Sequence, residues 1–181
     1  MNEQVLSEIK KLLTDGSHPY HWVDGFDGVP FDLLYKGEVI ARADHGKTYC
    51  CGLTLFAAVK AAEKMGLDLG SAKDLRAIKR DWFVATGKRK GPVDALVPRG
   101  LGTEIKFEDA LPGDMCQIWR RSGSGHSVIL INKQPDGFGY WSTQPATNGI
   151  GYRAEFFKGV KNPVTEIYIA RLNQKPNVTQ P

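Results

Sequence analysis

The sequence predicts an α+β protein in which helices pack on an antiparallel sheet. Residues 52–65 are apolar nearly all round, which is the pattern of a central, buried helix. Later segments alternate apolar with polar residues or are rich in β-branched and aromatic residues, which is typical of strands. These predicted strands cover residues 115–119, 126–132, 138–144 and 165–172.

The remaining elements fit the same class of fold. Residues 3–14 place their apolar side chains on one helical face and end before Gly16, so they predict an amphipathic helix. A further helix is expected near 71–86, where Ser71 and Asp74 allow a capping box. Residues 132–137 predict a hairpin turn. We expect one domain over residues 1–173 and a disordered tail over 174–181.

Composition and charge bound the function. The chain has 181 residues, of which 41% are hydrophobic and 24% charged, enough to bury a full core. A net charge of +4 is mild and does not indicate a nucleic-acid partner. The N-terminal residues lack a basic region followed by an apolar stretch, and no window is long enough to span a membrane. We therefore expect no membrane span. These residues do not indicate a localisation. Action in the cell envelope or outside the cell would need an export route that does not use such an N-terminal signal.

The cysteines are few, and their spacing is not that of metal ligands. Three cysteines in a chain of this length do not form a disulfide framework. The sequence contains no Cys-x-x-Cys and no His-x-x-x-His pattern, and vicinal cysteines make poor joint ligands. We expect no metal site and no cofactor.

A cysteine pair stands where an extended segment runs into the apolar helix. A cysteine at a helix N-terminus lies in the positive end of the helix dipole, which lowers its thiol pKa and favours the nucleophilic thiolate. Successive helical residues point about 100° apart, so Cys50 and Cys51 cannot both face one histidine, and one is chemical while the other is structural. His126, which opens a predicted strand, is the candidate general base and acid, and His45 is the rival.

A third polar residue is expected to orient the imidazole. If the hairpin turn centres near Pro135 and Asp136, the returning strand places Gln144 opposite His126. The amide oxygen of Gln144 can accept the imidazole Nδ1–H. Ser142 shares the same face of the strand and is the alternative.

Three short motifs occur in a fixed order: Cys50-Cys51-Gly52-Leu53, Leu111-Pro112-Gly113-Asp114 and His126-Ser127-Val128-Ile129. In these motifs the chain resembles the NlpC/P60-type cysteine peptidases, part of the papain-like group with the CHAP amidases, over roughly residues 45–145. The resemblance implies a papain-like fold whose nucleophile helix packs on an antiparallel sheet. It also implies that Cys50, two residues before the glycine, is the nucleophile and that His126 is the acid and base.

The chain departs from the family pattern beside the nucleophile. The family's Asp before the nucleophile is Tyr49 here, and its Ser after the nucleophile is Cys51. Because the family residues help to recognise the peptide, the resemblance implies a substrate-binding role for Tyr49, Cys51 and the nearby Ser142. We expect Tyr49 to lie at the rim of the substrate groove and to change what is recognised.

The resulting hypothesis is a cysteine-dependent amide hydrolase, namely a peptidoglycan peptidase or amidase with a cell-wall peptide as its substrate. Two alternatives remain. One is a catalytically inactive peptide- or glycan-binding module on the same fold. The other is a protein-directed acyl transferase or deamidase toxin, for which an inhibitor or immunity protein is unknown.

Overall fold

The structure, a computed structural model, describes residues 2–23, 25–83 and 89–174. Its helices are α1 (Asn2–Ile9), α2 (Cys50–Lys64), α3 (Ala72–Trp82) and α4 (Pro92–Leu96), with 3-10 turns η1 (Val97–Arg99), η2 (Phe107–Asp109) and η3 (Pro145–Thr147). Its strands are β1 (Leu33–Tyr35), β2 (Glu38–Ala41), β3 (Gly102–Ile105), β4 (Met115–Arg120), β5 (Gly125–Gln134), β6 (Gly137–Gln144), β7 (Gly149–Phe156) and β8 (Val164–Leu172). The predicted α+β class is confirmed. Among the helices of the described residues, none is long and apolar enough to cross a membrane.

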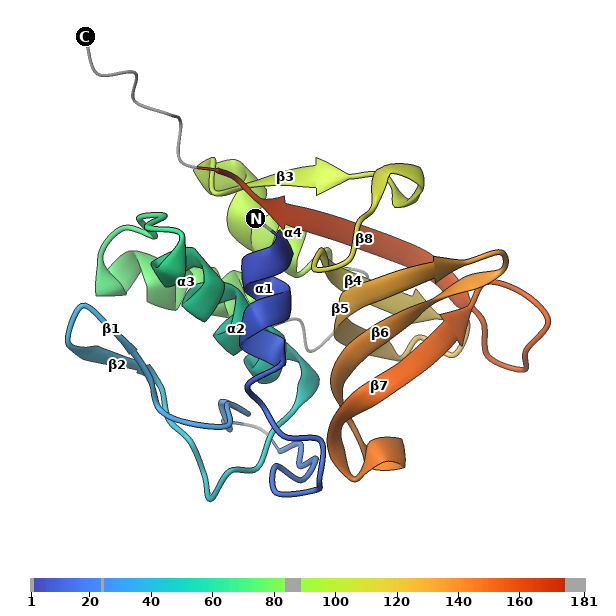
Figure 1. The fold of residues 1–181 in the computed structure, drawn as a ribbon, viewed down its shortest axis with the longest axis horizontal. Helices are drawn as coiled ribbons and strands as arrows, with labels where there is room; N and C mark the ends of the chain where they lie inside the picture. Colours follow the sequence, from blue (N-terminus) through green and yellow to red (C-terminus); the bar gives the residue numbers. More distant parts are fainter. Residues whose placement is uncertain (1, 24, 84–88, 175–181) are drawn as a thin grey trace, which may run out of the picture.

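The sheet is antiparallel, as predicted. Within the described residues its strand order is β3-β8-β4-β5-β6-β7, and β1 pairs with β2 in a separate hairpin. The predicted hairpin joins β5 to β6, with Gln134 opposite Gly137 across the turn. In Figure 1 the helices lie on the left, beside the sheet, and β5, β6 and β7 curve together on the right.

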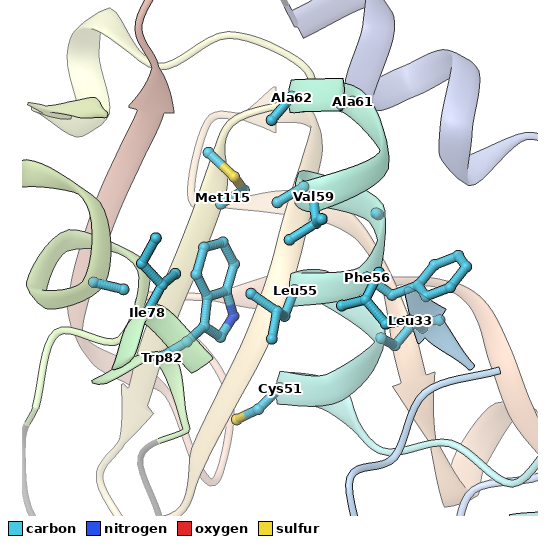
Figure 2. Packing of buried hydrophobic residues seen from close by; sticks show 14 of the residues in the cluster. Leu33, Cys51, Leu55, Phe56, Val59, Ala61, Ala62, Ile78, Trp82 and Met115 are labelled. Atoms are coloured by element: carbon cyan, nitrogen blue, oxygen red, sulfur yellow. The ribbon is translucent and has the colours of Figure 1, made fainter. Parts of the chain in front are cut away.

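Helix α2 is the centre of the core. It contacts β5 and β6 of the sheet, and α1 and α3 pack against it (Figure 1). Figure 2 shows Leu55 and Val59 directed toward Met115 and Trp82, while Phe56 lies on the side of Leu33. Each fully buried side chain of this size stabilises the fold by about 1.5–3 kcal/mol. A helix buried on several sides, as the sequence predicted, holds its first residues in a fixed position.

Two helix ends differ from their predicted bounds. Helix α1 ends at Ile9 because the N–H groups of Lys11 and Leu12 bond to carbonyls three residues back, which tightens the chain into turns. Helix α3 has the predicted capping box between Ser71 and Asp74 and ends at Trp82. Residues 84–86 of that predicted helix and 175–181 of the predicted tail lie outside the described residues.

The Pro-Gly-Asp turn before β4 is held by a buried carboxylate. Asp114 is fully buried and accepts hydrogen bonds from Arg171 on β8, at 2.8 Å from Nε and 2.7 Å from Nη2. It also accepts one from the Asn2 side chain and one from the Leu111 N–H, both at 2.8 Å. The turn is therefore tied to the sheet and to α1.

Replacing this carboxylate is expected to destabilise the fold. Asp114→Ala leaves the Arg171 guanidinium without its buried partner, and such a loss is worth about 3–5 kcal/mol. Asp136→Ala is the matched control, because its ion pair with Lys158 is exposed and contributes at most about 1 kcal/mol. Urea unfolding measures both. Equal losses of free energy of unfolding in the two variants would contradict this account.

Candidate active site

Cys50 is the first residue of α2. The preceding Tyr49 is extended, with φ −138° and ψ 165°, and no side chain caps the helix. The first N–H groups of a helix have no intrahelical partner, so they point a partial positive charge at a group placed there. Of the three cysteines, Cys50 is partly exposed, whereas Cys51 and Cys116 are buried. Cys50 is thus the cysteine that a substrate can reach.

Cys51 points into the core. Figure 2 shows Cys51 on the same side of α2 as Leu55, which lies one helical turn after it. Its Sγ lies 3.2 Å from the Ser127 Oγ and 4.0 Å from the Cys50 Sγ. The Ser127 hydroxyl donates its own proton to the Gln117 Oε1 at 2.7 Å. The sequence left open which cysteine is structural, and this packing assigns that position to Cys51.

His126 is held by a chain of hydrogen bonds. Its Nε2 lies 3.2 Å from the Gln144 Oε1, and the Gln144 amide Nε2 donates to the Thr147 Oγ1 at 2.5 Å. The Thr147 hydroxyl in turn donates to the Gly149 carbonyl at 2.6 Å. This chain orients the amide oxygen of Gln144 toward the ring, so the ring carries its proton on Nε2 and Nδ1 is left as the basic nitrogen.

This arrangement corrects one detail of the sequence-based expectation. Gln144 is paired with His126 as predicted, but through Nε2 rather than Nδ1 of the ring. Thr147, which fixes the Gln144 amide, was not anticipated. It lies in η3, immediately after β6, where no periodic pattern points to it.

Ser142 does not orient the imidazole. It shares the face of β6 with Gln144, but it is fully buried and donates to the Ser127 carbonyl at 2.7 Å. The register explains the outcome, since Leu130 pairs with Tyr140 and the same register carries His126 to Gln144. The hydroxyl of Ser142 therefore links β5 to β6 and does not reach the imidazole.

The Cys50 thiol is strongly acidified. A hydrogen bond from the Cys51 thiol, a hydrogen bond and the charge of His126, and the Ser127 backbone N–H hold the pKa of Cys50 well below its usual value, although burial opposes them. Because the ring Nε2 is engaged by Gln144, Nδ1 is the nitrogen available to the sulfur. The rival base His45 has an 89% exposed side chain and pairs with Asp44 instead.

Tyr49 lies in the core, so the expectation that it lies at the rim of a groove is wrong. It is only 7% exposed and packs against Phe26 and Phe83, with ring centroids 5.9 and 5.5 Å apart. A Cβ at Gly28 would overlap the Tyr49 ring, and a Cβ at Gly52 would overlap the Asp27 carbonyl. The extended Tyr49 is turned inward because the backbone of residues 27–28 crosses directly over the start of α2.

A groove of about 650 Å³ opens beside the imidazole. It is lined by His126 on β5, by Gln144 on β6 and by residues of β7. Its other polar lining includes Tyr20, Arg120, Tyr140, Arg153 and Glu155. Tyr140 packs edge-on against the His126 ring at 5.5 Å between centroids. The expected substrate-binding residues Tyr49, Cys51 and Ser142 are all buried and lie outside this lining.

No family model, curated protein or solved structure matches this chain. Within residues 2–23, 25–83 and 89–174, no group of three or more His, Cys, Asp or Glu side chains is arranged to hold a metal ion. The functional argument therefore starts from the geometry of Cys50, His126 and Gln144.

Removing the Cys51 thiol is expected to weaken the acidification of its neighbour. A hydrogen bond to a charged acceptor contributes about 1.5–3 kcal/mol, so Cys51→Ala should raise the pKa of Cys50 toward its ordinary value. The pH dependence of alkylation by iodoacetamide measures this. Cys51→Ser keeps a hydroxyl donor of similar size and should stay close to wild type. An unchanged profile in Cys51→Ala would contradict the hydrogen bond.

Removing the Gln144 amide should release the imidazole. We expect Gln144→Ala to lower kcat by about 100-fold, because small losses of alignment in a reacting pair have effects of that size. Thr147→Val keeps Gln144 but removes the hydroxyl that holds its amide, and should lower kcat by a smaller factor than Gln144→Ala. A Gln144→Ala variant with wild-type kcat would show that the ring is oriented by other groups.

Proposed function

We propose that this protein is a cysteine-dependent amide hydrolase. The observation that carries the proposal is the acidified, partly exposed Cys50 at the start of a buried helix, beside a histidine whose far nitrogen is held by Gln144. A nucleophile, a base and a residue that orients the base are the parts that thiol-based acyl transfer requires. A peptide- or glycan-binding module has no need of an ionised thiol, so this geometry favours the enzyme over the inactive alternative.

The reaction follows from the positions of these groups. The Cys50 thiolate attacks the amide carbonyl, and backbone N–H groups at the start of α2 stabilise the oxyanion, at about 3 kcal/mol per donor. Protonated His126 gives its Nδ1 proton to the leaving amine as the carbon–nitrogen bond breaks. Neutral His126 then takes a proton from water, which attacks the thioester and releases the acid and the thiolate.

The proposed substrate class is peptidoglycan peptide, either the stem peptide or the amide that joins it to the glycan. This part of the proposal rests on the resemblance of the motifs around Cys50, Asp114 and His126 to those of NlpC/P60-type peptidases. The mild positive charge of the chain is compatible with an anionic envelope.

Digestion of purified peptidoglycan tests the proposal. Wild type and Cys50→Ala are incubated with sacculi, and the soluble fragments are identified by mass spectrometry. We expect new amino and carboxyl ends with the wild type and none with Cys50→Ala. If the wild type alkylates rapidly at Cys50 but releases no fragment, the substrate class is wrong while the thiol chemistry stands.

A further inference from the structure

The groove beside His126 carries a cation, Arg153, that has no ion pair with any residue of the described ranges. Arg120 and Glu155 form an ion pair across it, with Nη2 and Nε of Arg120 at 2.5 and 3.1 Å from the same carboxylate oxygen. Arg153 also lines the groove and makes no ion pair or side-chain hydrogen bond within the described residues. The groove therefore presents one uncompensated positive charge to whatever occupies it.

The sheet places that charge at a defined position relative to the imidazole. Arg153 on β7 pairs with Tyr140 on β6, and the Tyr140 ring packs against His126 on β5. Tyr140 in turn pairs with Leu130, which lies four residues along β5 from His126. Two strand spacings of about 4.8 Å and four residue rises of about 3.3 Å put the backbone of Arg153 about 16 Å from that of His126, and both side chains line the same groove as the Tyr140 ring. Directly paired residues stand on the same face of a sheet, so the guanidinium lies on the imidazole side.

The proposed reaction determines which part of a substrate contacts the side of the sheet that carries His126 and Arg153. The acyl part stays bonded to Cys50 at the start of α2. The leaving amine must contact the imidazole that protonates it, so the fragment attached to that amine extends past His126. The groove lined by His126 and Arg153 is in the path of that fragment.

We propose that the groove is the leaving-group subsite and that Arg153 binds a carboxylate on the amine fragment, one or two residues beyond the cleaved bond. An extended peptide advances about 3.5 Å per residue, so a carboxylate one or two residues beyond the cleaved bond lies between the imidazole and β7. The long Arg153 side chain covers the remaining distance from β7. A guanidinium binds a carboxylate through paired N–H donors, which selects for that group over a neutral amide. This inference rests on the proposed thiol chemistry.

Partitioning of an acyl-enzyme tests the subsite without knowledge of the natural substrate. p-Nitrophenyl acetate transfers its acetyl group to the Cys50 thiolate and releases p-nitrophenolate in a burst. The thioester then reacts either with water, giving acetate, or with an added amine bound in the leaving-group subsite, giving the N-acetyl product and the thiolate. The amines are alanyl-alanine and alanyl-alanine amide, which differ only in the carboxylate and are compared at equal concentrations of unprotonated amine.

We expect alanyl-alanine to capture the acetyl group about three- to fivefold better than its amide, the size of an accessible ion pair. Arg153→Gln should reduce this preference to about one, and Arg153→Lys should keep part of it. Lys73→Gln removes the same charge from the exposed surface of α3, outside the groove, and should leave the preference unchanged. Added NaCl should weaken the wild-type preference by screening.

The outcomes separate the two proposals. A burst with equal capture of both amines, or a preference that survives Arg153→Gln, overturns the subsite and leaves the hydrolase. A preference lost equally in Lys73→Gln also overturns it, since only the general charge of the protein would then matter. Absence of a burst overturns the hydrolase, and the subsite with it.

Discussion

Cys50→Ala is expected to lower kcat/KM for amide hydrolysis by about 10⁵-fold or more, because loss of the nucleophile leaves only binding and oxyanion stabilisation. At pH 6, where an ordinary thiol is almost fully protonated, iodoacetamide should label wild type at Cys50 alone. Peptide mapping by mass spectrometry identifies the labelled residue, and initial rates give kcat/KM.

The other cysteines provide the controls for this variant. Cys116 is fully buried, and burial raises the pKa of its thiol, so it should stay unlabelled in the folded protein. Cys51→Ala should retain most of its activity, because the Cys51 side chain faces the core. Labelling of Cys51 in place of Cys50, or loss of activity only in Cys51→Ala, would move the nucleophile by one residue.

His126→Ala should have the second largest effect, a fall in kcat of about 10⁴-fold, the upper range for loss of a general acid and base. The variant should also shift the pH dependence of alkylation. A lowered pKa keeps Cys50 ionised well below pH 8.5, and loss of the His126 hydrogen bond and charge raises that pKa toward its ordinary value of about 8.5. The alkylation rate should therefore fall at pH 6 and approach the wild-type rate above pH 9.

His45→Ala is the matched control, because His45 is exposed and pairs with Asp44. It should leave both the pH profile and kcat unchanged. A His126→Ala variant with the wild-type alkylation profile would show that the thiolate owes its stability to the helix start and to Cys51. A change in His45→Ala of the size expected for His126→Ala would reverse the assignment of the base.

The features that follow a local period could be predicted from the sequence. The apolar run of α2 predicted a buried helix, and its first turn placed two cysteines on different sides. The two-residue period of β5 and β6, together with the turn near Pro135, predicted that Gln144 or Ser142 meets His126, and the structure shows Gln144 there. These contacts depend on spacing within one hairpin or one helix, which a sequence displays directly.

The features that depend on distant, irregular segments could not be predicted. Tyr49 was expected at a groove rim, but its burial depends on Phe26, Gly28 and Phe83, which come from segments with no common period. The choice of ring nitrogen depends on Thr147, a single hydroxyl in a 3-10 turn. Which arginine of the groove is left without an ion pair depends on which of the two Glu155 contacts, Arg120 or Arg153.

Residues 27–28 cross over the start of α2, so a fragment of this chain must include them if Cys50 is to keep its position. The motifs that carry the proposed resemblance to NlpC/P60-type peptidases occur within roughly residues 45–145, so a fragment cut at residue 45 would contain each of them. It would lack the Gly28 carbonyl that accepts the Tyr49 N–H at 3.2 Å, and the Asp27 backbone packed on Gly52. In such a fragment Tyr49 would keep Phe83 but lose Phe26 and Gly28, so one side of its ring would be uncovered and the backbone contacts that fix the direction of the helix start would be gone. Domain boundaries for this protein should therefore be drawn ahead of Phe26, by contact with the helix start rather than by motif.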